Sequence, residues 1–336
     1  MSAPLPTPAR ILQLATAGWL SQAVSATAEL GVADALAAGP RTVDQIAEEI
    51  GAHAPTLYRL LRAGADIELF EERPHHVFAL TELGDALRSD SPVSLRDFAI
   101  WTGLPAERAA WTELAAGVRT GSPVFERVHG ASVWDHIRDH PHVLGVFDRA
   151  MTQTSRQIIG SIVAAYDFTD LRTLVDVGGG RGALLSAILA ANPGLRGVLY
   201  DQPEVVAESG PVFKEAGVAE RATAEGGSFF DAVPAGGDAY LLSNIIHDWD
   251  DEPSVRLLSK VRAVLPEHGR VLLVEAVLPT DRPALNVKLM DLDMLLLCGG
   301  RQRTEAEFAV LLADAGLRLN RVVPGGHCSV VEAVVA

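Results

Sequence analysis

One histidine in the middle of the chain is placed where it could act as a base. His247 follows an apolar run, Tyr240–Ile246, and precedes Asp248 and Trp249. An imidazole exchanges a proton near neutral pH, and a neighbouring carboxylate fixes its tautomer and supports its charged form. Such a carboxylate, Glu275, ends a later apolar run. We therefore expect His247 to be a general base supported by Glu275, although an isolated histidine is otherwise a surface or core residue.

A strand, a glycine turn and a helix follow one another earlier in the chain. Asp176 ends the strand, glycines fill four of positions 178–182, and Ala183 begins the helix. Such a turn lets a cofactor approach the backbone at the carboxyl end of a parallel sheet. Gly178, Gly180 and Ala183 also satisfy the loose dinucleotide fingerprint. The carboxylate of Asp176 would repel a pyrophosphate but suits the cationic groups of S-adenosylmethionine. The latter is therefore favoured over a dinucleotide or a purely structural turn, with Gly178 and Gly180 as cofactor-binding residues.

A second acid and a pair of aromatic residues extend this cofactor hypothesis. Asp201 ends the next apolar run, 23 residues after Gly178. An acid about 20 residues after the glycine turn is where a ribose diol is bound, and a bland surface turn at residues 201–203 is the alternative. Ser228 and Phe229 follow a third strand. They would bond the edge of an adenine and stack on its face, or belong to a core aromatic pair.

The second half of the chain has the texture of an α/β domain. Short runs rich in Val and Leu alternate with amphipathic helices after Asp170, which predicts a parallel, doubly wound, Rossmann-like sheet. The carboxyl ends of such strands meet at one edge, so the motifs above would share a crevice. The expected strands are 172–177, 197–200, 237–246 and 270–278, with two more within 316–335.

The first half reads as almost entirely helical, and we expect domains at residues 1–168 and 169–336. Its helix-turn-helix and small wing are typical of a winged-helix unit, which binds DNA or serves as a dimerisation or lid domain. The second helix offers only Arg59 and Arg62, and the domain has no lysine, so dimerisation is favoured. The expected elements are helical spacing over 8–37, a helix from the capping box at Thr42–Gln45 through Glu49, a helix over Pro55–Leu61, a strand pair within His75–Leu80, a helix capped by Thr81, and one long helix over Pro141–Tyr166.

Composition excludes several classes of protein. Lys plus Arg is 28 and Asp plus Glu is 43, giving a net charge of −15, which is unlike the basic footprint of a nucleic-acid binder. Two cysteines are too few for a disulfide scaffold, and the N-terminus has no signal core. We expect a cytoplasmic enzyme with no membrane span and no nucleic-acid partner. His247 has no partner at a metal-ligand spacing, so no metal is expected.

Taken together, the motifs resemble those of a known family. They are similar to the small-molecule O-methyltransferases of the acetylserotonin and caffeic acid type, and most to the bacterial branch that decorates natural products. The resemblance covers nearly the whole chain, including the helical N-terminal domain. The motifs that carry it are the runs 176–182, 201–203, 227–231, 247–249 and 299–304.

The resemblance implies an intertwined homodimer that binds S-adenosyl-L-methionine and releases S-adenosyl-L-homocysteine. It implies cofactor contacts at Asp176, Gly178, Asp201, Gln202, Ser228, Phe229 and Ser243. It implies a base at His247 with supporting positions at Glu275 and Gln302, and substrate contacts at Phe147, Met151, Asn244, Asp293 and Met294. Three residues depart from the family pattern: Ser228 replaces an aspartate, Ser243 a lysine, and Gln302 a glutamate.

The expected reaction is methyl transfer to a phenolic or enolic hydroxyl of an aromatic or polyketide-type molecule. An imidazole with the ordinary pKa near 6.5 would take the proton of a phenol with a pKa near 10 at a cost of about 5 kcal/mol, so concerted general-base catalysis is expected. One alternative is an enzyme that keeps the cofactor but catalyses hydroxylation, decarboxylation or cyclisation. A regulator that senses the cofactor and binds DNA through the winged-helix unit is the less favoured one.

Overall fold

The chain folds into two compact units that do not follow one another in sequence. The computed structural model describes residues 6–336. The first unit ends at Ala109 and resumes over Trp134–Thr154, and the second comprises Ala110–Val133 and Ser155–Ala336. The long helix α12 (Pro141–Ala165) confirms the predicted one, and it contributes residues to both units. The domain boundary expected after residue 168 stays a prediction.

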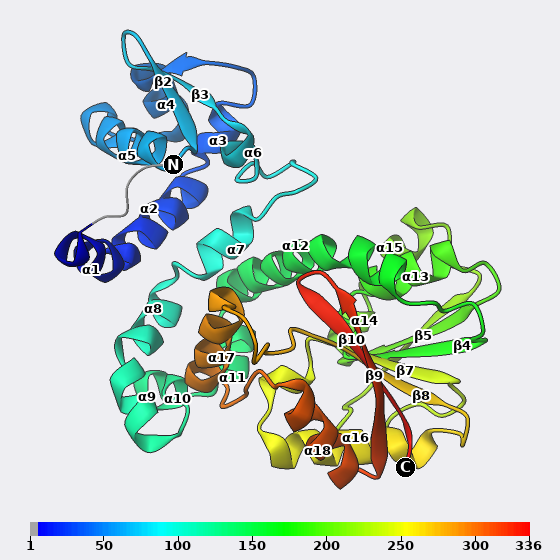
Figure 1. The fold of residues 1–336 in the computed structure, drawn as a ribbon. Coiled ribbons are helices and arrows are strands. Elements are labelled where there is room, and N and C mark those ends of the chain that lie inside the picture. Colours follow the sequence, from blue (N-terminus) through cyan, green and yellow to red (C-terminus); the bar gives the residue numbers. More distant parts are fainter. Residues whose placement is uncertain (1–5) are drawn as a thin grey trace. The chain divides into compact units, whose positions relative to one another are not determined.

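The second unit is built on a seven-stranded sheet, visible edge-on in Figure 1. Its order is β6-β5-β4-β7-β8-β10-β9, in which the first five strands are parallel and β10 runs antiparallel to both of its neighbours. Chain order reverses beside β4, which is where doubly wound sheets bind ligands. The strands are β4 (Thr173–Val177), β5 (Arg196–Asp201), β6 (Ala222–Gly226), β7 (Ala239–Ser243), β8 (Arg270–Glu275), β9 (Leu317–Gly325) and β10 (Cys328–Val335).

Apolar cores on both faces explain why these strands are hydrophobic without alternation. Leu174 packs into the core on one face, whereas Val175, the next residue of β4, packs into the core on the other. Each side chain is fully buried. The helices of this unit are α9 (Leu114–Thr120), α10 (Phe125–His129), α13 (Ala183–Ala191), α14 (Pro203–Val206), α15 (Ser209–Glu215), α16 (Asp251–Val264), α17 (Leu285–Leu297) and α18 (Glu305–Asp314).

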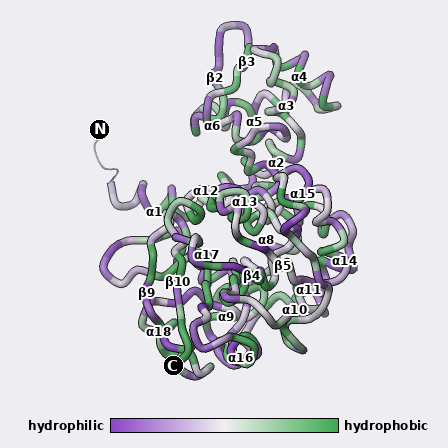
Figure 2. The backbone as a smooth tube through the Cα atoms, turned by 90° about the vertical axis from the view of Figure 1, so that its right-hand side faces the viewer, coloured by the Kyte–Doolittle hydropathy of each residue, from purple (hydrophilic) through white to green (hydrophobic). Residues whose placement is uncertain are grey.

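The first unit is mostly helical, but it also contains a small sheet of order β1-β3-β2. The strand pair expected within His75–Leu80 begins earlier, because residues 74–76 form the turn, with His75 and His76 at positive φ. Figure 2 shows this wing as a hydrophilic tip, and its β2 carries two acids and one arginine. The three strands are β1 (Arg41–Thr42), β2 (Phe70–Arg73) and β3 (Val77–Leu80).

The helices of the first unit follow local capping rules. The predicted capping box is confirmed: Thr42 and Gln45 bond reciprocally at the start of α4, which ends before the left-handed Gly51. The helical stretch expected over 8–37 is broken at Thr16 and at Gly31, where φ is 71°. The helices are α1 (Thr7–Ala15), α2 (Ala17–Glu29), α3 (Val32–Ala35), α4 (Val43–Ile50), α5 (Ala54–Asp66), α6 (Glu82–Asp85) and α7 (Arg96–Trp101). Of these, α5 is longer than expected, and α6 is capped by Thr81 as expected. Two more helices, α8 (Pro105–Thr112) and α11 (Val133–Asp139), begin in one unit and end in the other. Within residues 6–336 no helix has both the length and the apolar character needed to cross a bilayer.

Candidate active site

The glycine turn between β4 and α13 has a backbone conformation in which residues with side chains would be strained or would clash. Gly178, Gly180 and Gly182 have φ values of 72°, 60° and 83°, in the left-handed region that glycine enters without strain. A Cβ on Gly179 would lie 2.4 Å from Oδ2 of Asp176. The turn is therefore a closely packed cradle of backbone at the end of β4, where the glycine turn was predicted.

Asp176 is a buried carboxylate without a partner of its own. Its side chain is 1% exposed, and neither of its oxygens accepts a hydrogen bond from any residue in 6–336. Burial, and then the charge of Asp201, raises its pKa to about 7. An orphaned carboxylate beside a glycine cradle fits a cationic ligand without phosphates, and S-adenosylmethionine has this chemistry.

Asp201 organises the same turn from the end of β5. Its Oδ2 accepts the N–H of Gly180 at 2.8 Å, and its Oδ1 accepts the N–H of Gln202 at 2.7 Å. Burial raises the pKa of Asp201, whereas these two backbone bonds lower it. The carboxylate thus fixes the loop, and its contact with a ribose stays a prediction.

Aromatic residues connect the loop after β6 with the segment that carries His247. Phe229 contacts Phe230 with ring centroids 4.9 Å apart, and Phe230 meets Trp249 edge-on at 4.8 Å. Phe229 also lies beside the turn, since one of its ring atoms is 3.6 Å from the Cβ position of Gly178. The preceding Ser228 accepts the N–H of Asp231 with its carbonyl at 3.0 Å.

His247 lies on a short 3₁₀ helix, η1 (Ile246–Asp248), directly after β7. The strand ends at Ser243, and Asn244 then turns the chain with a φ of 53°. The N–H of Asn244 still bonds to the carbonyl of Val274 on β8, at 2.9 Å. We call residues 246–249 the His247 turn.

Two carboxylates face the two nitrogens of His247. Nδ1 lies 3.1 Å from Oε2 of the fully buried Glu275, and Nε2 lies 3.4 Å from Oδ1 of Asp248. Burial lowers the pKa of His247, but the charges of Glu275 and Asp248 outweigh it and raise the pKa to about 10. The ordinary value near 6.5 assumed from the sequence is therefore wrong for this site. Nε2 faces a second acid, Asp248, which the sequence analysis did not identify as a partner although it is the next residue.

The segment after α17 packs directly on the His247 turn. A Cβ on Gly300 would lie 2.0 Å from the carbonyl oxygen of His247, and that oxygen accepts the N–H of Arg301 at 2.9 Å. Gln302 is 2% exposed, and its backbone N–H bonds to Oδ1 of Asp291 at 2.8 Å. Its side-chain nitrogen has no hydrogen-bond partner within residues 6–336, and the supporting role expected of Gln302 stays a prediction.

The five substrate positions implied by the resemblance are divided between the units. In the second unit, Asp293 on α17 accepts a bond from Nε1 of Trp111 at 2.7 Å, and Met294 next to it is 9% exposed. Asn244 lies just before the His247 turn. Trp111 belongs to none of the sequence motifs, and only the hydrogen bond to Asp293 shows that it lies beside a predicted substrate position.

Phe147 and Met151 lie one turn apart on the part of α12 that belongs to the first unit. The ring of Phe147 meets Trp101 edge-on at 5.1 Å and Trp134 at 6.2 Å. Phe147 is thus part of an aromatic cluster within the first unit.

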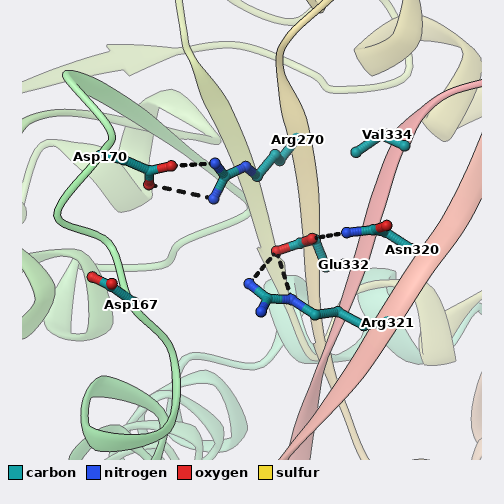
Figure 3. Close-up of a pocket in the computed structure, with 7 residues that line it drawn as sticks. All are labelled: Asp167, Asp170, Arg270, Asn320, Arg321, Glu332 and Val334. Carbon is teal, nitrogen blue, oxygen red and sulfur yellow. Dashed lines mark hydrogen bonds and ion pairs between the residues drawn. The ribbon is translucent and has the colours of Figure 1, made fainter.

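The cavity in Figure 3 is at the opposite edge of the sheet, because Arg270 begins β8 whereas Glu275 ends it. It encloses about 460 Å³, and its charges pair with one another: Arg270 with Asp170, and Arg321 with Glu332. Its polar groups are thus already satisfied, unlike those of Asp176. Within residues 6–336 no three His, Cys, Asp or Glu side chains form a metal cluster.

Comparison with known proteins matches both parts of the chain. A family model described as the O-methyltransferase domain matches residues 111–318, and one described as the O-methyltransferase dimerisation domain matches residues 12–90. A phenazine O-methyltransferase of Lysobacter antibioticus is 41% identical over 330 residues, covering 98% of this chain and 96% of that protein.

Solved structures agree over the full length. The crystal structure titled LaPhzM has a TM-score of 0.94 and 40% identity, covering 99% of this chain and all of that one. NcsB1, an O-methyltransferase from neocarzinostatin biosynthesis solved with S-adenosylmethionine and 2-hydroxy-5-methyl naphthoic acid, has a TM-score of 0.81 and 37% identity, covering 94% of this chain and 96% of that one. The chain is therefore a member of the O-methyltransferase family that uses S-adenosylmethionine as its cofactor and acts on small aromatic molecules.

Proposed function

We propose that this enzyme methylates a phenolic or enolic hydroxyl of an aromatic small molecule, with His247 as general base. The single observation that carries the proposal is the position of His247 at the carboxyl edge of the sheet, with Nδ1 3.1 Å from the buried Glu275. An imidazole supported by a carboxylate is built to take a proton. The relatives named for O-methylation of phenazine and binding of a naphthoic acid support an aromatic acceptor.

The cofactor would be held by Asp176, a carboxylate without a partner within residues 6–336, and by groups that already order the glycine turn. Asp176 would face the cationic amino-acid end, and Asp201 the ribose hydroxyls. Gly178, Gly180, Gln202, Ser228, Phe229 and Ser243 would complete this binding site. When bound, S-adenosylmethionine supplies an electrophilic methyl group on a sulfonium. The residues of the chain contribute binding, orientation and exclusion of water.

The raised pKa of His247 changes how the proton is handled. At a pKa of about 10, the imidazole matches an ordinary phenol, so the transfer itself is nearly balanced. The cost moves to an earlier step, because at pH 7 only about one His247 in a thousand is neutral, which corresponds to about 4 kcal/mol. Glu275 and Asp248 then stabilise the imidazolium that forms. We expect the base to become more effective as the pH rises toward 10.

In the second unit, the acceptor would lie beside His247, Asn244, Asp293 and Met294. Phe147 and Met151 of the first unit remain substrate contacts predicted from the resemblance. Gln302 offers a buried amide donor that no residue in 6–336 uses, so an acceptor's oxygen could take it. We further propose that the protein is a homodimer joined through its N-terminal domain, consistent with the family match over residues 12–90.

The experiment is methylation of a panel of aromatic acceptors by the purified protein, followed by mass spectrometry and by measured release of S-adenosylhomocysteine. Each hydroxylated acceptor is paired with its methyl ether, which has no proton to lose. Methylation of hydroxyls at one position, with no turnover of the matched ethers, is the expected result. A product formed without consumption of S-adenosylmethionine would overturn the proposal in favour of a non-methylating reaction.

A further inference from the structure

Arg303 is the largest fully buried side chain in the part of the chain that the structure describes, at 1% exposure. Removing a guanidinium from water is costly unless its donors are satisfied. Its carboxylate partner, Asp251, is 57% exposed, and Nε and Nη2 of Arg303 reach one of its oxygens at 3.0 and 2.8 Å. A half-exposed acid at the start of α16 does not explain why the arginine is buried so deeply.

The remaining donors of Arg303 bond to the backbone around His247. Nη1 bonds to the carbonyl of Ile246 at 3.0 Å, and Nη2 bonds to the carbonyl of Trp249 at 2.9 Å. These two carbonyls are at the ends of the His247 turn. The other donors to these carbonyls are farther away: the N–H of Trp249 reaches the carbonyl of Ile246 at 3.3 Å, and the hydroxyl of Ser254 reaches the two carbonyls at 3.4 and 3.3 Å. Arg303 therefore makes the shortest side-chain bond to each end of the turn.

Glu275 holds the same turn by accepting hydrogen bonds from the N–H groups of the turn. Its Oε1 accepts the N–H groups of Ile246 at 2.9 Å and His247 at 3.3 Å, while its Oε2 lies 3.1 Å from Nδ1 of His247. The peptide groups of the turn are therefore fixed by a carboxylate on the N–H side and by a guanidinium on the carbonyl side. The imidazole can meet Glu275 only while the turn keeps this path.

We infer that Arg303 is a positioning residue for methyl transfer: it fixes the His247 turn so that the imidazole faces Glu275. The inference rests on the proposed role of His247 as the base. Arg303 acts through the backbone and touches neither reactant. Lysine cannot replace it, because its single ammonium group cannot span the two carbonyls and Asp251, whereas the planar guanidinium does so with fixed geometry.

The chain offers a matched control in Arg221. This guanidinium also holds backbone carbonyls, those of Leu189, Asn192 and Leu195, at 2.8, 3.1 and 2.7 Å. These lie at or beyond the C-terminal end of α13, away from the glycine turn at its other end. Arg303→Lys and Arg221→Lys therefore remove the same kind of interaction from two places, of which only one holds His247.

The test compares both variants in the full-length protein. We expect Arg303→Lys to lower kcat about 10- to 100-fold, the scale of a misplaced catalytic group, with the affinity for S-adenosylmethionine within about twofold of wild type. NMR titration of His247 in the ligand-free protein should show a lower pKa, because the pairing with Glu275 loosens and Asp248 alone remains. Arg221→Lys should change neither kcat nor this pKa. Unchanged kcat and pKa in Arg303→Lys would overturn the inference.

A double-mutant cycle separates positioning from a general structural effect. In a His247→Ala background, Arg303→Lys should leave the residual rate unchanged within about twofold, because the group that it positions is already gone. A further large loss there would also overturn the inference. Should His247→Ala keep the wild-type rate, the proposed base fails, and the NMR titration still tests the effect of Arg303 on the turn.

If Arg303→Lys does not fold, Asp251→Ala is the second variant. It removes the oxygen that accepts from Nε and Nη2 of Arg303 and leaves the arginine in place. We expect a smaller fall in kcat and in the pKa of His247, and no fall in the residual rate when the change is made in the His247→Ala background. A folded Asp251→Ala protein with wild-type kcat and wild-type pKa would overturn the inference.

Discussion

Glu275 uses its two oxygens for two different tasks toward His247. Oε1 accepts the backbone N–H of His247 at 3.3 Å, and Oε2 lies 3.1 Å from Nδ1 of its imidazole. One buried carboxylate therefore bonds to the backbone of this residue and lies at ion-pair distance from its side chain, although neither Nδ1 nor Oε2 has a hydrogen-bond partner within residues 6–336. Its removal should affect geometry and charge together.

His247→Ala should lower the rate of methylation of a phenol with an ordinary pKa by about 10²- to 10⁴-fold, the usual contribution of a general base. Affinity for S-adenosylmethionine, measured by calorimetry, should change little, because the residue is assigned to the acceptor. The loss should shrink for more acidic phenols, which ionise without help. Full activity of the variant at pH 7 on a high-pKa phenol would remove His247 from the role of base.

Glu275→Gln should shift the pH profile of kcat/KM to lower pH. Burial alone lowers the pKa of His247, and Glu275 contributes the larger of the two charges that raise it to about 10. In the wild type, log kcat/KM should therefore climb through pH 7–9 with a slope near one, and in the variant it should level off earlier. The acceptor should be a phenol with a pKa near 10, which still carries the proton that the base must take over most of this range. Identical profiles would show that Glu275 does not control the base.

Asp176→Asn should stabilise the ligand-free protein and weaken cofactor binding. The folded pKa of about 7 lies above the ordinary 3.8, so protonation favours the folded state. This contribution is complete below pH 3.8 and is lost as the pH rises to 7. The stability gain of the variant should therefore be larger at pH 8 than at pH 5.5, by about 2 kcal/mol in denaturant unfolding.

The affinity of the wild type for S-adenosylmethionine should rise between pH 6 and pH 8, as Asp176 ionises, and that of Asp176→Asn should stay flat. A wild-type affinity independent of pH across this range would show that the carboxylate does not meet the cationic end of the cofactor.

Asp201→Ala should weaken S-adenosylmethionine binding by about 1.5–3 kcal/mol, the scale of a hydrogen bond to a charged group. Part of this loss would come from the released N–H of Gly180. Asp201→Asn, which keeps one oxygen acceptor, is the matched variant and should lose less. Calorimetry that finds wild-type affinity in a folded Asp201→Ala protein would place Asp201 outside the cofactor site.

The protein should be a dimer in solution, joined through the apolar surface of α1 and α2. Leu12 and Trp19 are 66% and 77% exposed in the single chain, and residues 12–90 match a dimerisation domain. Light scattering at micromolar concentration should give a dimer for the wild type and a smaller species for Leu12→Gln with Trp19→Ser. Val310→Gln, on a 63% exposed residue of α18, is the control and should stay dimeric. A monomeric wild type would contradict the prediction.

The sequence predicted the sheet and its edge well, because apolar runs and glycine turns are local signals. The turn at 178–182, the capping box at Thr42 and the long helix α12 are all where they were expected. The break of the first helical stretch at Thr16 was not visible, since apolar spacing continues on both sides of it.

The electrostatics of the site could not be read from the sequence in the same way. The pKa of His247 depends on how deeply it is buried and on which oxygens face it, and both follow from tertiary packing. Arg303 was missed for a related reason: it bonds to backbone carbonyls, which carry no residue type. Asp248 could have been found, because it adjoins His247 at the end of a strand.

Gly300 has a consequence for how this enzyme can be diversified. No side chain fits between its backbone and the carbonyl of His247, where a Cβ would lie 2.0 Å away. Two positions later, the Gln302 side chain leaves its amide nitrogen unused. In a saturation library over residues 299–303, position 300 should return only glycine, while position 302 should accept many residues and alter which acceptors are methylated. New acceptor specificity would thus evolve most readily at position 302, because the rest of the segment 299–303 is constrained by its packing against the His247 turn.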